Sequence, residues 1–259
     1  MNGHIGWWGL AASMVLIVIA VALSMWQRLD LERSMVWSSV RALVQLLAVG
    51  SVLGYLLDPN RPVALSTTWV VLMVVVAAIT IQNRAPEVPG IFWLGLASVG
   101  IATAIGLGVL LGLRIFPVQG RTMVPLSGMI VGNAMAATVV ASRRIVGELS
   151  DKRSEVEARL ALGLSSADAA RPYVRSALRT ALIPQIESTK AVGLVALPGA
   201  MTGLILAGVK PVDAVKVQAA VMFLILGGVA TAVTVLSIGL TRRLFTPDHR
   251  LLPLERTSG

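Results

Sequence analysis

The stretch IFWLGLASVGIATAIGLGVLLGL, residues 91–113, contains 23 residues and no charged side chain. A bilayer core about 30 Å thick needs roughly 20 apolar residues in a helix, so this stretch predicts a transmembrane helix. The rest of the chain agrees, because 56% of its 259 residues are hydrophobic, 14% are charged and its mean hydropathy is +0.81. These values are typical of a membrane protein.

Further apolar runs of nearly the same length lie on both sides of this stretch. They cover residues 7–26, 36–57, 65–81, 123–141, 191–208 and 218–240. The expected fold is therefore all-α, a polytopic membrane protein of about seven transmembrane helices in a single domain, residues 1–259. The first run is interpreted as an uncleaved anchor, because no basic segment precedes it and Arg28 and Arg33 follow it.

Lysine and arginine indicate the orientation of these helices. With the N-terminus outside, fifteen of them fall in the inner connecting segments and five in the outer ones. Because cytoplasmic segments carry the excess of Lys and Arg, the C-terminal tail, residues 241–259, is expected in the cytoplasm. The expected location is the inner (plasma) membrane, and the net charge of +9 is attributed to this bias rather than to nucleic-acid binding.

The residue inventory excludes several kinds of site. The chain has no cysteine and only two histidines, at positions 4 and 249, so a transition-metal site is not expected. No HExxH, GxSxG or GxxxxGK[ST] pattern occurs, so the chain is expected to be neither an intramembrane enzyme nor an ATPase. We expect no cofactor bound by this chain.

The long connection at residues 142–188 predicts a cytoplasmic pair of amphipathic helices between the fifth and sixth spans. Ser154 and Glu157 have the spacing of a capping box for the first helix, and Gly163 is placed to end it. Ser165 or Ser166 is a candidate cap for the second helix. Pro172 either starts that helix or kinks it.

The second helix carries an arginine at every fourth position, residues 171, 175 and 179, opposite an apolar face. One interpretation is that this helix lies on anionic lipid headgroups.

The first helix has the spacing of the EAA loop of ABC-transporter permeases, a short cytoplasmic helix that docks on an ATPase subunit. Glu157 and Ala158 supply its first two positions, and Gly163 supplies its glycine. The candidate ATPase-docking residues are Glu155, Val156, Glu157, Ala158, Arg159, Leu160 and Gly163.

Three further stretches extend this similarity: RALVQLLAVGSVL (41–53), PLSGMIVGNAM (125–135) and VGLVALPGAMTGLILAGVKPVDAVKVQ (192–218). Together with EARLALG they resemble the FetB family of ABC permeases, over roughly residues 35–225. The family includes a bacterial iron-export permease and membrane subunits of plant half-transporters linked to aluminium tolerance.

The resemblance implies an exporter of iron or another metal or metal-linked solute. It also implies a partner ATPase subunit that holds ATP and Mg²⁺, with two copies of each chain. The sequence departs from the family's PGMMTGQ-like segment at Ala200 and Leu204, which puts the substrate in doubt.

Polar and soft side chains in the apolar runs are candidates for a translocation path, since such groups are costly in a membrane. Pro198 and Gly199 interrupt the sixth run and permit an unwound turn. Each of these features also has a structural alternative to a role in the path. Arg41 can snorkel to the headgroups, Asn133 can bond to a neighbouring helix, and the proline can form a packed kink. The full set of path candidates is Arg41, Gln45, Met129, Asn133, Met135, Pro198, Gly199, Met201 and Thr202.

Carboxylates are expected only at the edges of the spans, as with Glu187 and Asp213. The absence of a titratable group at mid-membrane disfavours the alternative function, a secondary transporter of a small polar solute. A chelated metal or an organic solute fits the ABC exporter as well as a bare ion does.

Overall fold

A computed structural model describes residues 6–58, 61–88, 90–193 and 196–253, and these residues are helical throughout apart from short connections. They form two compact units, residues 1–58 and 59–259. The helices are α1 (Trp7–Gln27), α2 (Glu32–Leu56), α3 (Val63–Arg84), α4 (Ile91–Gly112), α5 (Gly120–Asp151), α6 (Arg153–Ala161), α7 (Ser166–Ala191), α8 (Gly199–Leu206) and α9 (Pro211–Arg243).

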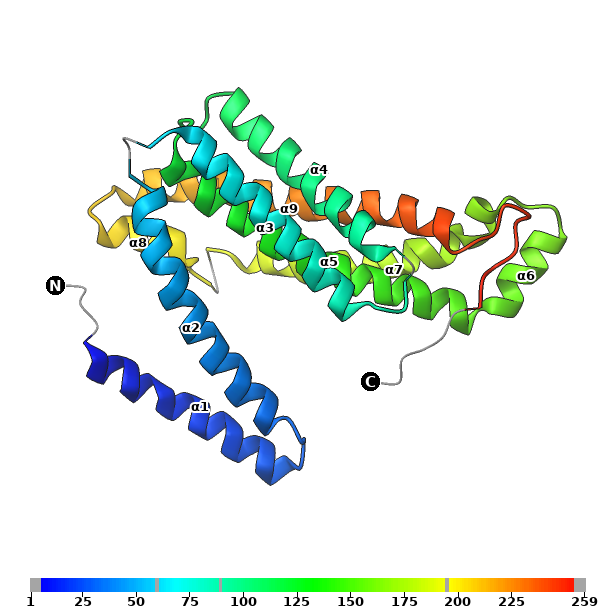
Figure 1. Cartoon of the computed structure of the whole chain (residues 1–259), viewed down its shortest axis with the longest axis horizontal. Helices are drawn as coiled ribbons and strands as arrows, with labels where there is room; N and C mark the ends of the chain where they lie inside the picture. The colour runs from blue at the N-terminus through cyan, green and yellow to red at the C-terminus, as the bar shows by residue number, and fades with distance from the viewer. Residues whose placement is uncertain (1–5, 59–60, 89, 194–195, 254–259) are drawn as a thin grey trace. The chain divides into compact units, whose positions relative to one another are not determined.

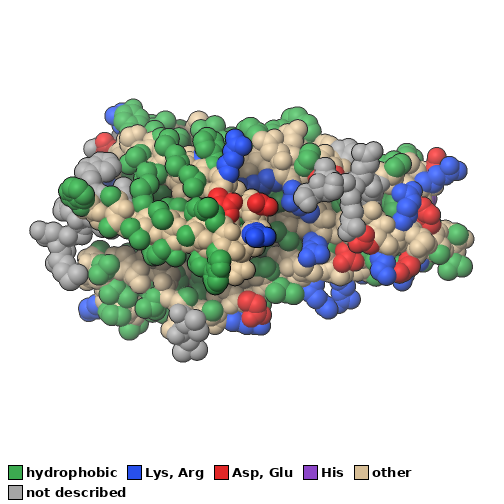
Figure 2. Space-filling view, turned by 90° about the horizontal axis from the view of Figure 1, so that it is seen from below, with side chains coloured by type: hydrophobic (Ala, Val, Ile, Leu, Met, Phe, Trp, Pro, Cys, Tyr) green, Lys and Arg blue, Asp and Glu red, His purple; other side chains and the backbone are tan. Residues whose placement is uncertain are grey.

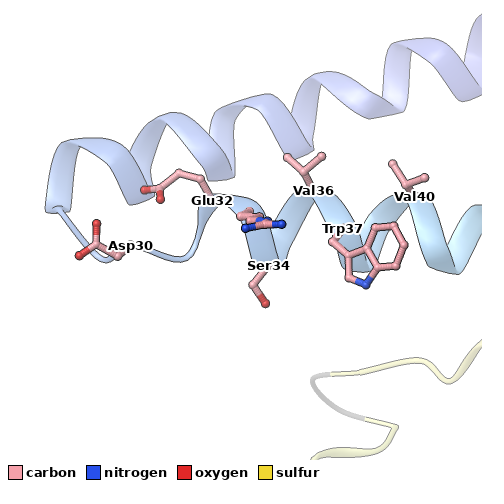
Figure 3. A pocket seen from close by; sticks show the side chains of 7 residues that line it. Asp30, Glu32, Ser34, Val36, Trp37 and Val40 are labelled. Atoms are coloured by element: carbon pink, nitrogen blue, oxygen red, sulfur yellow. The ribbon is translucent and has the colours of Figure 1, made fainter. Parts of the chain in front are cut away.

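The first unit is a hairpin of α1 and α2. Two residues at the turn, Arg28 (φ 53°) and Asp30 (φ 54°), adopt left-handed backbone conformations, and the buried Ser24 hydroxyl donates a 2.7 Å hydrogen bond to Glu32. Figure 3 shows Asp30 and Glu32 at this turn, with Trp37 further along α2. The turn therefore places charged side chains at one end of the hairpin and a Trp within about two helical turns of it.

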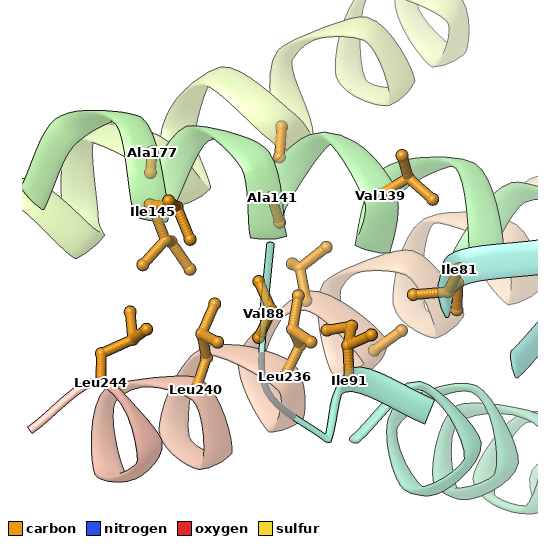
Figure 4. Close-up of a cluster of buried hydrophobic side chains, with 14 of the residues drawn as sticks. Ile81, Val88, Ile91, Val139, Ala141, Ile145, Ala177, Leu236, Leu240 and Leu244 are labelled. Atoms are coloured by element: carbon orange, nitrogen blue, oxygen red, sulfur yellow. The ribbon is translucent and has the colours of Figure 1, made fainter. Parts of the chain in front are cut away.

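The second unit is a helical bundle in which α5 packs against α3, α4, α7 and α9 (Figure 1). Helices α5 and α9 are parallel: the α-carbon of Gly228 approaches Ile130, and Leu240 and Leu244 lie beneath Ile145 in the same buried cluster (Figure 4). A β-carbon on Gly228 would lie 2.9 Å from the Ile130 side chain, so a glycine is required for this close approach.

The inner end of the bundle is marked by arginines bonded to the short α3–α4 connection. Arg143 of α5 donates a 2.7 Å hydrogen bond to the Arg84 carbonyl, and Arg243 of α9 donates one of 3.0 Å to the Gly90 carbonyl. Figure 2 shows the charged side chains gathered toward the α6 end, whereas hydrophobic side chains cover much of the remaining surface. The basic residues thus lie where the sequence places the cytoplasmic side.

Five described helices are long and apolar enough to cross a membrane, namely α2, α3, α4, α5 and α9, and the described apolar part of α1, Ala11–Gln27, is shorter. The chain is therefore a polytopic all-α membrane protein with five or six such spans. The prediction of a helical span at residues 191–208 is wrong. Only α8, with 8 residues, lies there, and its length of about 12 Å cannot cross the bilayer.

The chain between α5 and α9 returns across the bundle by another route. Because α5 and α9 are parallel, the segment that joins them must run back from the inner to the outer end. Helix α7, with 26 residues, follows α5 and α9 for most of this distance, and α8 lies further along the chain before α9. The predicted sixth span, residues 191–208, thus contains the last residue of α7, non-helical residues at 192–193 and 196–198, and the short helix α8.

Candidate functional site

Helix α6 begins differently from the prediction. It starts at Arg153, and no capping side chain accepts a hydrogen bond from the backbone N–H groups of its first turn, so the prediction of a capping box at Ser154 and Glu157 is wrong. Glu157 instead accepts a 2.7 Å hydrogen bond from Arg153, and Glu155 accepts one of 2.9 Å from Lys152. These ion pairs stabilise α6 through its side chains rather than through a cap.

Gly163 ends α6, as predicted. Its φ of 85° is left-handed, its N–H donates to the Leu160 carbonyl at 2.9 Å, and the Leu164 N–H donates to the Arg159 carbonyl at 3.3 Å. This pair of hydrogen bonds is a Schellman motif, which satisfies two carbonyls that a helix end leaves free. Glycine is favoured here because other L-residues are strained at such a φ.

The inner face of α6 is fixed to α7. Val156 is fully buried, so it cannot itself contact a partner, and Tyr173 donates a 2.9 Å hydrogen bond to Glu155. Hydrogen bonds from Lys152 and Tyr173 lower the pKa of the Glu155 carboxyl, whereas burial raises the pKa of the Tyr173 phenol. The Arg159 guanidinium lies 5.7 Å from the centre of the Tyr173 ring, a cation–π distance.

The C-terminal tail supports α6, a contact that sequence patterns did not indicate. Arg153 donates to the carbonyls of Leu251 (2.9 Å) and Leu252 (3.1 Å), and the Leu251 side chain is buried. The His249 ring lies 2.6 Å from the Ser166 hydroxyl at the start of α7. The tail therefore connects both helices of the predicted cytoplasmic pair.

The outer face of α6 and its C-terminal end remain exposed. Glu155, Glu157 and Ala158 are exposed, whereas Arg159 and Leu160 are half-buried. Beyond the helix, the side chain of Leu162 is 83% exposed and that of Leu164 is 41% exposed. Of the predicted docking residues, all but Val156 thus have surface available to another protein.

Helix α7 has the predicted serine cap and the predicted separation of an apolar face from an arginine face. Ser165 caps it by accepting a hydrogen bond from the Asp168 N–H at 3.2 Å, and Pro172 lies inside the helix rather than at its start. Ala177 and Ala181 face the core, and the three arginines at positions 171, 175 and 179 are exposed. Because α7 runs antiparallel to α5, its arginine stripe is directed along the bundle, which argues against a helix lying flat on headgroups.

The candidate path residues are divided between the two units. Arg41 and Gln45 are exposed on α2 in the first unit. On α5, Asn133 is exposed and donates a 2.8 Å hydrogen bond to the Met129 carbonyl of its own helix, while Met135 packs against the main buried cluster. Asn133 therefore has a bond within its helix rather than to a neighbour.

The remaining path candidates lie at the interruption before α8. Pro198 is its N-cap, Gly199 is its first residue, Met201 is buried and Thr202 donates to the Gly199 carbonyl at 3.0 Å. The interruption includes a left-handed Gly193 (φ 92°) and a bridge between Val192 and Ala196. Among the described residues, 192–193 and 196–198 are not helical, so the chain is unwound next to Pro198.

Two features of the bundle did not enter the sequence prediction, the burial of Gln218 and the packing of α7 along the bundle. Gln218 of α9 is 4% exposed, and its amide oxygen has no partner among the described residues. Glu187, which the sequence predicted at the edge of a span, lies on the last turns of α7, a helix that packs against α5 and α9. The amide could have been found as a polar residue in the apolar run 218–240, but α7 is too polar to be recognised by hydropathy.

The fold is that of a polytopic helical membrane protein, and the relatives place it among permease-type membrane proteins. The chain belongs to the uncharacterised protein family UPF0014, whose sequence profile matches residues 7–245. It is 34% identical to the "Probable iron export permease protein FetB" of Escherichia coli strain K12, over 97% of both chains. It is 38% identical to the "UPF0014 membrane protein STAR2" of Oryza sativa, over 87% of this chain and 79% of the relative.

A further plant relative, "Protein ALUMINUM SENSITIVE 3" of Arabidopsis thaliana, is 37% identical over 88% of this chain and 82% of its own length. No solved structure matches the chain significantly. The resemblance inferred from the three sequence stretches is thus confirmed over most of the chain.

Proposed function

We propose that the chain is the membrane-spanning subunit of an ABC exporter for iron, another metal or a metal-linked solute. The observation that carries the proposal is the construction of α6. Its inner side is fixed by the buried Val156 and by Tyr173, while its outer side and the Leu162 end are exposed. A helix held rigidly on one side and open on the other can dock a partner and transmit that partner's motion.

The path of this motion is supported by the connections of α6. The helix follows α5 directly and contacts α7, and the other end of α7, at Ala191, is followed by the non-helical residues Val192 and Gly193. A displacement of α6 would therefore act on α7, a long helix of the bundle that ends just before these residues. Unwound segments between half-helices are where transporters commonly bind their substrates.

The energy source in this proposal is a separate ATPase subunit carrying ATP and Mg²⁺, since the sequence has no phosphate-binding loop. Two copies of each subunit would form the transporter. The lysine and arginine bias supports the inner (plasma) membrane as its location, with the N-terminus outside. Iron as substrate is supported by the name of the bacterial relative.

The test is co-purification of the tagged protein from its own membranes, followed by an ATPase assay. We expect a stoichiometric ATPase chain that is lost when Glu157 and Gly163 are replaced, with the protein still folded in the membrane. The control is Asp213→Asn, an exposed carboxylate on the first turn of α9. Recovery of the protein alone, with full transport in ATP-free vesicles, would contradict the proposal.

The same experiment tests the alternative, a secondary transporter of a small polar solute. The position of Glu187 favours this alternative more than the sequence did, because it supplies a titratable group within the bundle. The alternative leaves the fixed and exposed faces of α6 without a role. Transport that persists without ATP would support it.

A further inference from the structure

An ion pair occupies the final turns of α7. The Lys190 ammonium lies 2.8 Å from the Glu187 carboxylate, and the side chains of Lys190 and Glu187 are 67% and 61% exposed. A second pair with the same i, i+3 spacing, Asp213 and Lys216 on α9, has a distance of 3.1 Å and similar exposure. The two pairs differ in where they lie along the bundle.

The depth of Glu187 follows from the antiparallel packing of α7 on α5. Ala177 and Ile145 belong to the same buried cluster (Figure 4). Arg179 follows Ala177 by two residues and Arg143 precedes Ile145 by two, so in these antiparallel helices the two arginines lie at a similar level. Arg143 marks the inner end of the bundle. Glu187 is eight residues beyond Arg179, or about 12 Å along α7, which is close to the middle of a 30 Å core.

The Asp213–Lys216 pair lies outside this region. Lys216 is 27 residues from Arg243, which lies at the inner end of α9, and this separation corresponds to about 40 Å of helix. That length exceeds the bilayer core, so the pair on α9 meets water at the outer side. Only the α7 pair lies at mid-membrane depth.

Charges at that depth are not stable against lipid. An Asp or Lys at the centre of a membrane helix is costly to insert, so such residues face an interior or aqueous surface. The exposed Asn133 lies on α5 twelve residues from Ile145, and Glu187 lies on α7 ten residues from Ala177. The two side chains are therefore within about 3 Å of the same level along the bundle axis.

We propose that Glu187 is a cation-binding residue of the translocation path, and that Lys190 is its counter-ion when no cation is present. The inference rests on the proposed transport function and adds a residue and a ligand class to it. A hard metal cation would displace the Lys190 ammonium and take the Glu187 carboxylate, with the amide oxygen of Asn133 as a second ligand. Carboxylate and amide oxygens are the ligands that such cations prefer.

The composition of the site suits passage rather than storage. The described residues contain no group of three or more His, Cys, Asp or Glu able to hold a metal ion. A cation would thus meet one carboxylate and a competing ammonium group. Binding of this kind is weak enough to permit release, as conduction requires.

The first test uses the absence of cysteine from the chain, which makes every introduced thiol unique. The Glu187→Cys variant should react with a charged, membrane-impermeant thiol reagent. Its control is Val76→Cys, an exposed position on α3 eight residues from Arg84 and hence at the same depth, which should stay unreactive. Equal lack of reaction at both positions would overturn the inference, whatever the energy source of transport.

The second test measures Fe²⁺ uptake into inside-out vesicles that contain the full complex. Glu187→Gln should lower ATP-dependent Fe²⁺ uptake at least tenfold without loss of the co-purifying ATPase, while Glu187→Asp retains part of it and Asp213→Asn all of it. Normal uptake by Glu187→Gln would overturn the inference and leave the exporter intact. If Fe²⁺ uptake into wild-type vesicles does not depend on ATP, the proposed function is refuted instead. The thiol reactions alone would then decide the inference.

Discussion

The glycine that ends α6 provides the sharpest test of the coupling surface. Gly163 has a φ of 85°, and a β-carbon added to it would meet no heavy atom within 4 Å. The cost of Gly163→Ala is therefore conformational rather than steric, about 1 to 2 kcal/mol for an L-residue in the left-handed region. Asparagine tolerates this region better, whereas proline cannot adopt it and also removes the N–H that donates to Leu160.

This cost translates into a measurable loss of affinity. If the last turn of α6 must keep its native conformation to dock the ATPase, about 1 to 2 kcal/mol weakens binding roughly 5- to 30-fold, since 1.4 kcal/mol is a factor of ten. We expect the affinity of detergent-solubilised protein for the purified ATPase to decrease in the order wild type, Gly163→Asn, Gly163→Ala, Gly163→Pro. Coupled transport should fall in the same order.

The matched control is Gly147→Ala on α5. Gly147 also has no heavy atom within 4 Å of an added β-carbon, but its φ is not left-handed. It should bind the ATPase as the wild type does. Unchanged affinity of Gly163→Ala, or an equal loss in Gly147→Ala, would refute the argument that the left-handed turn maintains the docking surface.

Three further predictions concern packing, the tail and pH. Gly228→Ala should unfold about 4 to 8 °C below Gly227→Ala in detergent melting curves. Of these two β-carbons, only the one at residue 228 collides with Ile130, and this overpacking destabilises the fold by about 2 kcal/mol. Equal melting temperatures would contradict the close approach of α9 to Ile130. Arg153→Ala should speed tryptic cleavage after Arg250 because it releases the C-terminal tail, whereas Lys152→Ala should not. Equal cleavage rates would contradict the role of the Arg153 hydrogen bonds in holding the tail. The depressed pKa of Glu155 means that its contribution to α6 is complete above the ordinary glutamate value of about 4.3 and is lost as the pH falls through the lower folded value. Hydrogen exchange of α6, corrected for intrinsic rates, should therefore stay constant from pH 7 to 5 and rise only in stronger acid; a rise near pH 6 would contradict this assignment.

Local features were predicted well where the residues that specify them are adjacent in the sequence. The end of α6 at Gly163 and the cap at Ser165 are examples, because a left-handed glycine and a capping serine act on the backbone next to them. The capping box at Ser154 failed although its spacing was correct. Ion pairs with Lys152 and Arg153 engage the Glu155 and Glu157 side chains instead.

The packing of α7 along the bundle could not be recognised by the same rules. Its buried face consists of small residues such as Ala177 and Ala181, and its other face carries arginines, Glu187 and Lys190, so its average hydropathy is low. The run 191–208 is more hydrophobic, but Gly193 and Pro198 interrupt its helix. Hydropathy therefore assigned the crossing to the wrong residues.

The amino-acid sequence by itself determined that this is a helical membrane protein with its basic side at one end, because the bilayer imposes both requirements on composition. It also determined the family, through stretches that keep their order along the chain. Only the tertiary structure decided that Val156 is inaccessible, that the C-terminal tail is hydrogen-bonded to Arg153 of α6, and that α7, with Glu187 on its last turns, packs along α5 and α9. These properties depend on contacts between helices that are distant in the sequence, and no local pattern of residues encodes such contacts.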